Sequence, residues 1–200
     1  DSDNDGDSEN DADLTGEDIE WTNVKPGEYE LHLIIENSAG LTDSDSIKVY
    51  VSYAGKWSDF EMGGNTSGNA VTLDFDLNVV YDKDNGNTIR KAVGELTYPK
   101  IDGDCTNIGG TNNCRAKLDV YAFNEEDEEA SNTSDTGLDQ RSDGDDCDED
   151  DNDCVFLSLS PYMFTDTESS YGDGDWVMQI RNEKINDLQV ESFIIRLHYK

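Results

Sequence analysis

The chain has 200 residues, enough for one large or two small domains. Its 47 Asp and Glu residues outnumber its 14 Lys and Arg residues and give a formal net charge of −33, which disfavours nucleic acids and anionic membranes as partners and favours divalent cations and basic partners. No apolar run reaches the roughly 18 residues of a membrane-spanning helix, and the dense carboxylates would also suit solubility in a salty medium.

Residues 1–20 form an acidic stretch with few apolar side chains. Every odd position of its first part carries a carboxylate: Asp1, Asp3, Asp5, Asp7, Glu9, Asp11 and Asp13. Calcium takes about 6–8 oxygen ligands, and Gly6 would allow a sharp bend, so this spacing predicts a calcium loop. It is not an EF-hand, because Ala12 stands where that loop has Glu and no helix pattern flanks it. A disordered acidic tail is the alternative.

The start of the chain lies inside this acidic motif, and no initiator Met is present. We therefore expect the chain to be a trimmed piece of a longer polypeptide.

Two strands are expected next, over residues 29–35 and 47–51, because apolar residues recur there at every second position. Residues 37–40, Asn-Ser-Ala-Gly, have the composition of a turn. The pattern predicts a hairpin over residues 28–52, followed by a short connector that starts at residues 54–55.

The remaining chain also alternates with the period of a strand. Further strands are predicted over residues 71–79, 89–98, 116–123, 155–159, 176–180 and 192–199. Asn85-Gly86 is a hairpin-turn signal, and residues 125–153 are expected to form a long acidic insertion. No segment has a sustained helical period, so we predict an all-β fold of the sandwich type.

Four cysteines form two close pairs along the chain, Cys105 with Cys114 and Cys147 with Cys154. Their even number and short spacing predict two local disulfides and an oxidising compartment. A four-cysteine zinc site is the alternative, although its pairs are usually closer in sequence.

A second acidic cluster surrounds the Cys147–Cys154 segment. Its members are Asp143, Asp145, Asp146, Asp148, Asp150, Asp151 and Asp153. A disulfide would hold these like charges together, and a bound calcium ion would relieve their repulsion. We predict a second calcium site here, with a solvated insertion as the alternative.

Two sequons, at Asn65 and Asn132, are candidate N-glycosylation sites in predicted loops. Three aromatic residues, Trp57, Phe60 and Tyr171, would either form a platform that stacks on sugar rings or pack into the core.

The motif Pro26-Gly27-x-Tyr29, the following strand, Gly40, the turn Asp43-Ser44-Asp45 and the exit strand Val49-x-Val51 together resemble the end of a PKD domain, an immunoglobulin-like module of cell-surface proteins. The resemblance implies that residues 1–53 are the C-terminal part of such a module. Ig-like sandwiches have about 100 residues, so we expect this half to be completed by preceding polypeptide, by another subunit or by a donated strand.

The motif Gly174-x-Trp176-x-Met178-x-Ile180, followed by Asp187-Leu188 and a last strand over 193–197, resembles the closing strands of the P-domain, the jelly-roll module of proprotein convertase-type proteases. Phe193 stands where such families usually have Trp. The resemblance implies that residues 54–200 form a jelly roll that accompanies an enzyme and often binds calcium. A generic jelly roll is the alternative.

Enzyme signatures are absent from the sequence. It contains no G-x-S-x-G or H-E-x-x-H motif, and its two histidines, His32 and His198, fall at positions expected to face outward. We therefore expect a non-catalytic, calcium-stabilised protein of the cell surface or extracellular space, with a structural or adhesive role in a surface layer, stalk or filament. Its partners would be other subunits, bound by strand complementation, and glycans. The alternative is a carbohydrate- or ligand-binding module, or a P-domain-like accessory, of a secreted hydrolase or protease.

Overall fold

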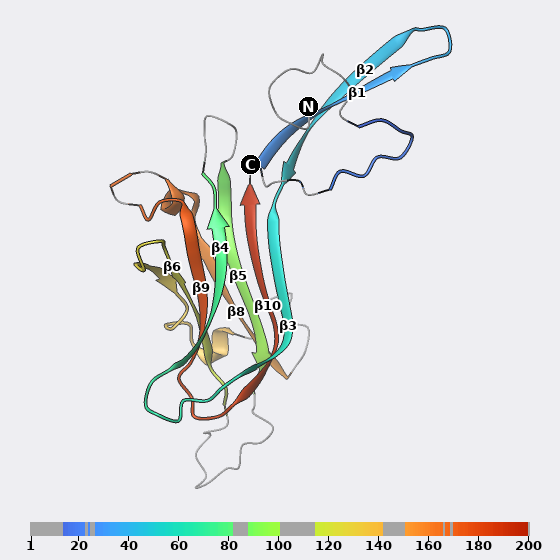
Figure 1. Cartoon of the computed structure of the whole chain (residues 1–200). Helices are drawn as coiled ribbons and strands as arrows, with labels where there is room; N and C mark the ends of the chain where they lie inside the picture. The colour runs from blue at the N-terminus through green and yellow to red at the C-terminus, as the bar shows by residue number, and fades with distance from the viewer. Residues whose placement is uncertain are drawn as a thin grey trace.

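The computed structural model describes residues 14–22, 24, 27–81, 88–100, 115–141, 151–165, 167–168 and 170–199. Within these residues the chain is a β-sandwich with a hairpin that projects from one end (Figure 1). The predicted all-β class is confirmed. The helical elements described are two short 3₁₀ turns, η1 (Leu138–Gln140) and η2 (Pro161–Phe164), and no described helix is long and apolar enough to cross a membrane.

The sandwich consists of two four-stranded antiparallel sheets. The first has the order β3 (Tyr53–Met62), β10 (Leu188–Tyr199), β5 (Ile89–Pro99) and β8 (Asn152–Leu159). The second has the order β4 (Val71–Val79), β9 (Gly174–Asn182), β6 (Leu118–Phe123) and β7 (Glu129–Asn132). Apart from the step from β6 to β7, consecutive strands alternate between the sheets, which wraps the chain around the core as in a jelly roll.

The projecting hairpin pairs β1 (Gly27–Glu36) with β2 (Thr42–Val51) along their full length. Its turn is organised by Asn37, whose Oδ1 accepts hydrogen bonds from the backbone N–H of Ala39 (2.9 Å) and Leu41 (3.1 Å). Gly40 adopts a left-handed φ of 76°, which glycine tolerates without a steric penalty. The predicted hairpin is therefore confirmed.

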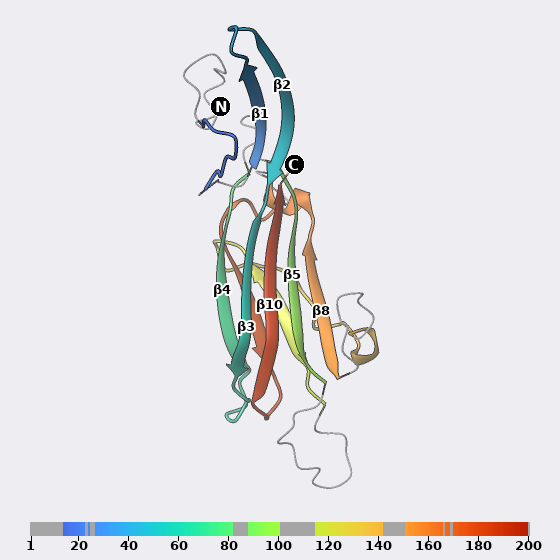
Figure 2. The same ribbon diagram turned by 90° about the vertical axis from the view of Figure 1, so that its right-hand side faces the viewer.

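Strands β2 and β3 follow each other with only Ser52 between them, so they form one long strand that pairs with two other strands. β10 pairs with the β3 half and β1 with the β2 half, both antiparallel. The end of β10 lies at the junction, where the N–H of Tyr199 donates to Oγ of Ser52 (3.4 Å). β1 and β10 consequently pair with successive parts of the same strand (Figure 2).

The core between the two sheets is rich in aromatic side chains. Phe193 is fully buried, and its ring lies 4.7 Å from that of Phe75 and 6.2 Å from that of Trp57. Trp57, Phe60 and Tyr171 all pack against this core. Of the two expected roles, these residues therefore have the one in core packing and not the one in a sugar-binding platform. Burying a large apolar side chain contributes about 1.5–3 kcal/mol, so this cluster holds the sheets together.

Most predicted strands are present, and β4 coincides with the predicted residues 71–79. Two expectations are wrong. The connector expected at residues 54–55 is part of β3, whose alternation is broken by a left-handed residue, Asp59 (φ 56°). Residues 125–153 are not only an insertion, because β7, η1 and the start of β8 lie within them, held by backbone pairing rather than by apolar side chains. The turn predicted at Asn85-Gly86 lies outside the described residues.

The predicted division into units at 1–53 and 54–200 stays a prediction. Its boundary falls at the first residue of β3, where the long strand passes from the hairpin into the sandwich.

Candidate functional site

A group of exposed apolar side chains lies on the projecting hairpin. In the strand register Leu31 is opposite Ile47, and Leu33 and Ile35 follow on the same side of β1. Leu33 is 58% exposed, Ile35 55% and Ile47 64%. We call the surface formed by Leu31, Leu33, Ile35 and Ile47 the hairpin face. Large apolar side chains exposed side by side are unusual on a monomer and commonly mark a contact surface.

The hairpin face differs in character from base to tip. Near the base, the ring of Trp21 packs edge-on against Tyr29, with 4.9 Å between ring centroids. Near the tip, Asp45 lies opposite Leu33 and Asp43 opposite Ile35. The face is therefore partly covered at its base and, toward its tip, combines open apolar residues with two carboxylates.

Most predicted calcium ligands lie outside the described residues. These are Asp1, Asp3, Asp5, Asp7, Glu9, Asp11 and Asp13 of the first loop, and Asp143, Asp145, Asp146, Asp148 and Asp150 of the second. Asp151 is exposed, and its backbone oxygen accepts from the N–H of Lys100 (2.7 Å). Asp153 is buried and accepts from Nη2 of Arg115 (2.8 Å). Within the described residues, no group of three or more His, Cys, Asp or Glu side chains is placed to hold a metal.

Of the four cysteines, only Cys154 lies in the described part of the chain. It is buried in β8 and disulfide-bonded. Its predicted partner Cys147, and the predicted pair Cys105 and Cys114, lie outside the described residues, so both pairings stay predictions.

The two sequon asparagines are both in described segments. Asn65 is partly exposed, and its Oδ1 accepts from the N–H of Gly68 (2.8 Å). Asn132 is exposed at the end of β7, but its Nδ2 donates to Oε1 of Glu129 (2.6 Å) and its Oδ1 accepts from Oγ of Ser134 (2.6 Å). A glycan on Asn132 would have to replace those contacts.

An internal polar network that the sequence did not reveal is centred on Arg141, whose side chain is fully buried. Its guanidinium donates to Oδ1 of Asp119 (2.5 Å), the hydroxyl of Tyr98 (2.9 Å) and the backbone oxygens of Thr136 (3.2 Å), Thr133 (3.3 Å) and Leu118. Burial raises the pKa of Tyr98, which keeps the phenol neutral beside the cation. Arg141 thus ties the segment after β7 to both sheets.

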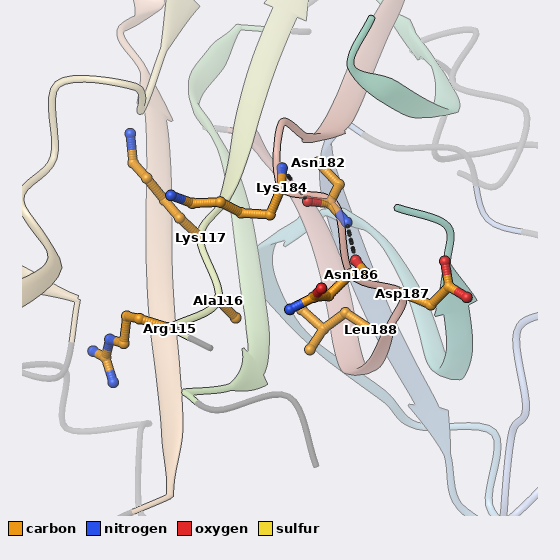
Figure 3. Close-up of a pocket in the computed structure, with 8 residues that line it drawn as sticks. All are labelled: Arg115, Ala116, Lys117, Asn182, Lys184, Asn186, Asp187 and Leu188. Carbon is orange, nitrogen blue, oxygen red and sulfur yellow. Dashed lines mark hydrogen bonds between the residues drawn. The ribbon is translucent and has the colours of Figure 1, made fainter. Parts of the chain in front are cut away.

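A surface hollow lies between the segment leading into β6 and the turn after β9 (Figure 3). It is lined by Arg115, Ala116, Lys117, Asn182, Lys184, Asn186, Asp187 and Leu188. Asn182 closes its floor by donating to the backbone oxygens of Gly63 and Asn186, each at 3.0 Å. The hollow has a volume of about 10 Å³, room for about one water molecule and far below the roughly 300–1,000 Å³ of typical small-molecule pockets.

Comparison with known proteins shows a weak structural similarity to a β-sandwich. The chain matches no protein-family model and no curated protein sequence. A solved structure from a study of "the promiscuous specificity of the carbohydrate-binding modules from the beta-sandwich super family" aligns with 87% of this chain and 73% of its own chain, at 12% sequence identity and a TM-score of 0.25. At that TM-score the similarity carries no argument about what this chain binds.

Proposed function

We propose that this chain is a non-catalytic structural or adhesive module of the cell surface or extracellular space, which associates with another polypeptide through its β1–β2 hairpin. The observation that supports this role is the exposure of the hairpin face.

A two-stranded hairpin that projects into water is at best marginally stable on its own. Here each strand has ten residues, and among the described strands β1 and β2 pair only with each other. Their outer edges have no strand partner among the described residues and can accept a further strand, beside an apolar face that water solvates poorly. A partner that adds a strand and covers the hairpin face would remove both costs.

The chemistry of that partner follows from the residues that border the face. Asp43 and Asp45 flank Leu33 and Ile35, so a complementary surface is an apolar β-sheet with Lys or Arg at its margin. The one Lys of the hairpin strands, Lys48, forms an ion pair with Glu28 on the opposite side. If the partner were the hairpin face of a second copy of this chain, it would therefore bring no cation to Asp43 and Asp45. We infer that the partner is a sheet of another polypeptide.

The double substitution Leu33→Lys/Ile47→Lys is expected to abolish association while leaving the sandwich folded. Both side chains are exposed, so the melting temperature should change little, whereas charges placed in an apolar contact are costly. We expect at least a tenfold loss of a fluorescently labelled chain from the surface assembly of its native cells.

The matched control is Ser44→Lys/Ser46→Lys. Both residues lie on β2, on the opposite side of the hairpin, so the control adds the same two charges away from the hairpin face. Equal retention of the two double variants would contradict the proposed role of the hairpin face.

Calcium remains part of the proposal, through the two carboxylate-rich stretches of sequence at residues 1–13 and 143–153. Carboxylate oxygens are the ligands that calcium prefers, and the ion would offset the repulsion within each stretch. Removing calcium with a chelator at moderate salt is expected to lower the melting temperature by about 5–10 °C for a site held near 100 times its Kd. Differential scanning calorimetry measures this change, and restoring excess calcium should reverse it. A melting curve that does not respond to chelator would remove calcium from the proposal.

The second candidate function is that of an accessory module that binds carbohydrate or another ligand beside a secreted enzyme, in the manner of a P-domain or a sugar-binding domain. It is favoured by the ring of Phe123, which is partly exposed on the outer side of β6, because an exposed aromatic ring offers a stacking surface to sugars. Glycan-array binding that is lost in Phe123→Ala, but not in Leu33→Lys/Ile47→Lys, would favour this candidate over the hairpin-mediated role.

A further inference from the structure

The two long edges of the sandwich are closed to different extents. β7 and β8 border one edge, and β3 and β4 border the other, where Figure 2 shows them next to each other. At the β7–β8 edge, the backbone N–H of Cys154 donates to the backbone oxygen of Arg141 (2.6 Å), in the segment that follows β7. The apolar side chains that β8 directs toward the core, those of Val155, Leu157 and Leu159, are at most 3% exposed. This edge is therefore covered by the chain itself.

The β3–β4 edge is open by comparison. Five of the side chains that these two strands direct toward the core are only partly buried: Trp57, Phe60, Val71, Leu73 and Phe75. The rings of Trp57 and Phe60 lie 4.8 and 5.9 Å from the ring of Phe75, so they meet between the two sheets. Among the described strands, β4 pairs only with β9 and β3 only with β10. Both strands thus present an edge without a strand partner, beside a row of apolar side chains that water still reaches.

Of the two strands, β4 is the one suited to accept a further strand. Its nine residues, Val71–Val79, alternate without interruption and include no proline or glycine. β3 is interrupted by Asp59, whose left-handed φ of 56° changes the course of the strand. Interruptions of this kind commonly protect an edge strand against pairing, and β4 has none.

The outer side of β4 determines the charge of a strand that could pair with it. Asp74 and Asp76 are exposed on this side, away from the core. Asp74 accepts from Nε2 of Gln179 (2.7 Å), and neither aspartate forms an ion pair within the described residues. Opposite charges on neighbouring strands stabilise their pairing, and like charges destabilise it. A strand beside β4 is therefore expected to carry Lys or Arg on its outer side.

The β4 strand of a second copy does not meet this requirement. If two β4 strands paired antiparallel about Phe75, Asp74 of each copy would lie opposite Asp76 of the other, and like charges directly opposite each other are unfavourable. The charges of β4 thus disfavour edge-to-edge association of two copies and favour a strand of different sequence.

We propose that an extended segment of another polypeptide, in which apolar and basic residues alternate, adds to the open edge of β4 as a further strand of its sheet. Its apolar side chains pack beside Leu73 and Phe75 and complete the cover of the core. Its Lys or Arg side chains lie beside Asp74 and Asp76. Backbone hydrogen bonds supply the affinity of such strand addition, and the alternating side chains supply its specificity. The site lies on the sandwich and goes beyond the role proposed for the hairpin face.

The probe is a fluorescently labelled synthetic peptide in which five valines alternate with four lysines. Its anisotropy is measured with the whole chain at about 0.15 M salt, which screens attraction to the acidic chain beyond about 8 Å. We expect a Kd below about 1 mM. A control peptide with the same residues in paired order has the same charge but cannot direct all its valines to one side of a strand. It should bind at least about tenfold more weakly.

The variant Asp74→Asn/Asp76→Asn should bind the alternating peptide about tenfold more weakly, because both opposite-charge neighbours are lost. The matched control Asp43→Asn/Asp45→Asn removes the same two charges from the hairpin and should leave binding unchanged. In hydrogen exchange, the peptide should slow the exchange of backbone N–H groups in β4 but not in β1 or β8.

The variant Leu33→Lys/Ile47→Lys should bind the alternating peptide as the unaltered chain does, so failure of this inference and failure of the hairpin-mediated role are distinguishable. The inference is overturned if the alternating peptide does not bind at about 1 mM or if the paired-order peptide binds equally well. It is also overturned if Asp74→Asn/Asp76→Asn leaves binding unchanged, or if the peptide protects β1 and β2 instead of β4.

Discussion

Substitution of Arg141 by Met is expected to lower the free energy of unfolding by about 3–5 kcal/mol, because it breaks a buried ion pair by removing one partner. Asp119 is only 3% exposed, and its Oδ1 accepts from Arg141. After the substitution, Asp119 would keep Lys117 at 3.3 Å and the hydroxyl of Thr133 at 3.3 Å. The phenol of Tyr98 and three backbone oxygens would lose their shared donor as well.

Urea denaturation of the two proteins measures this difference, and Lys117→Met is the matched control. Lys117 contacts the same carboxylate but is 28% exposed, so its removal should cost about 1 kcal/mol or less. If Arg141→Met cost no more than Lys117→Met, the buried guanidinium would not be the element that anchors the segment after β7.

Substitution of Trp176 by Ala is expected to cost about 3–5 kcal/mol, the usual range for removing a large buried aromatic side chain. Trp176 is 1% exposed, and its ring lies 4.9 Å from that of Phe164 in η2. Its indole N–H donates to the backbone oxygen of Gly172 (3.1 Å). The substitution would leave a cavity at the end of the sandwich where η2 and the entry to β9 pack.

Trp176→Phe separates the two contributions, because it keeps a ring in the core but removes the hydrogen bond. We expect it to cost about 1–2 kcal/mol, from the lost hydrogen bond and the smaller ring. Trp21→Ala, which removes a half-buried tryptophan at the base of the hairpin, should change the melting temperature of the sandwich far less than Trp176→Ala. Equal effects of the two alanine substitutions would contradict the assignment of Trp176 to the core.

Strands with one buried face could be predicted from the sequence, because their apolar residues recur at every second position. β4 is the clearest case, with Val71, Leu73, Phe75, Leu77 and Val79 all directed toward the core. β3 was missed because its two core aromatics, Trp57 and Phe60, are three residues apart. The left-handed residue Asp59 between them changes the side on which the following side chains lie.

The edge strand β7 could not be predicted, since its sequence Glu-Ala-Ser-Asn has no apolar alternation. It forms because its backbone pairs with β6. Sequence patterns describe what a strand buries, and β7 buries little.

The candidate functional features also include some that the sequence pointed to and some that it did not. The hairpin face lies on the half sandwich that the sequence predicts to need another segment to complete it. The Arg141 network could not be predicted, since a single arginine within an acidic stretch gives no local signal and its side-chain partners Tyr98 and Asp119 lie 43 and 22 residues away in the sequence.

The pairing of β1 and β10 with successive parts of the β2–β3 strand has a mechanical consequence. Tension applied at the hairpin would travel down that one strand into the ladder between β3 and β10. The pull would act along the strands, so the hydrogen bonds of that ladder would be loaded together in shear instead of opening one after another. A module anchored through its hairpin would thus resist being pulled apart with the whole length of the β3–β10 pair.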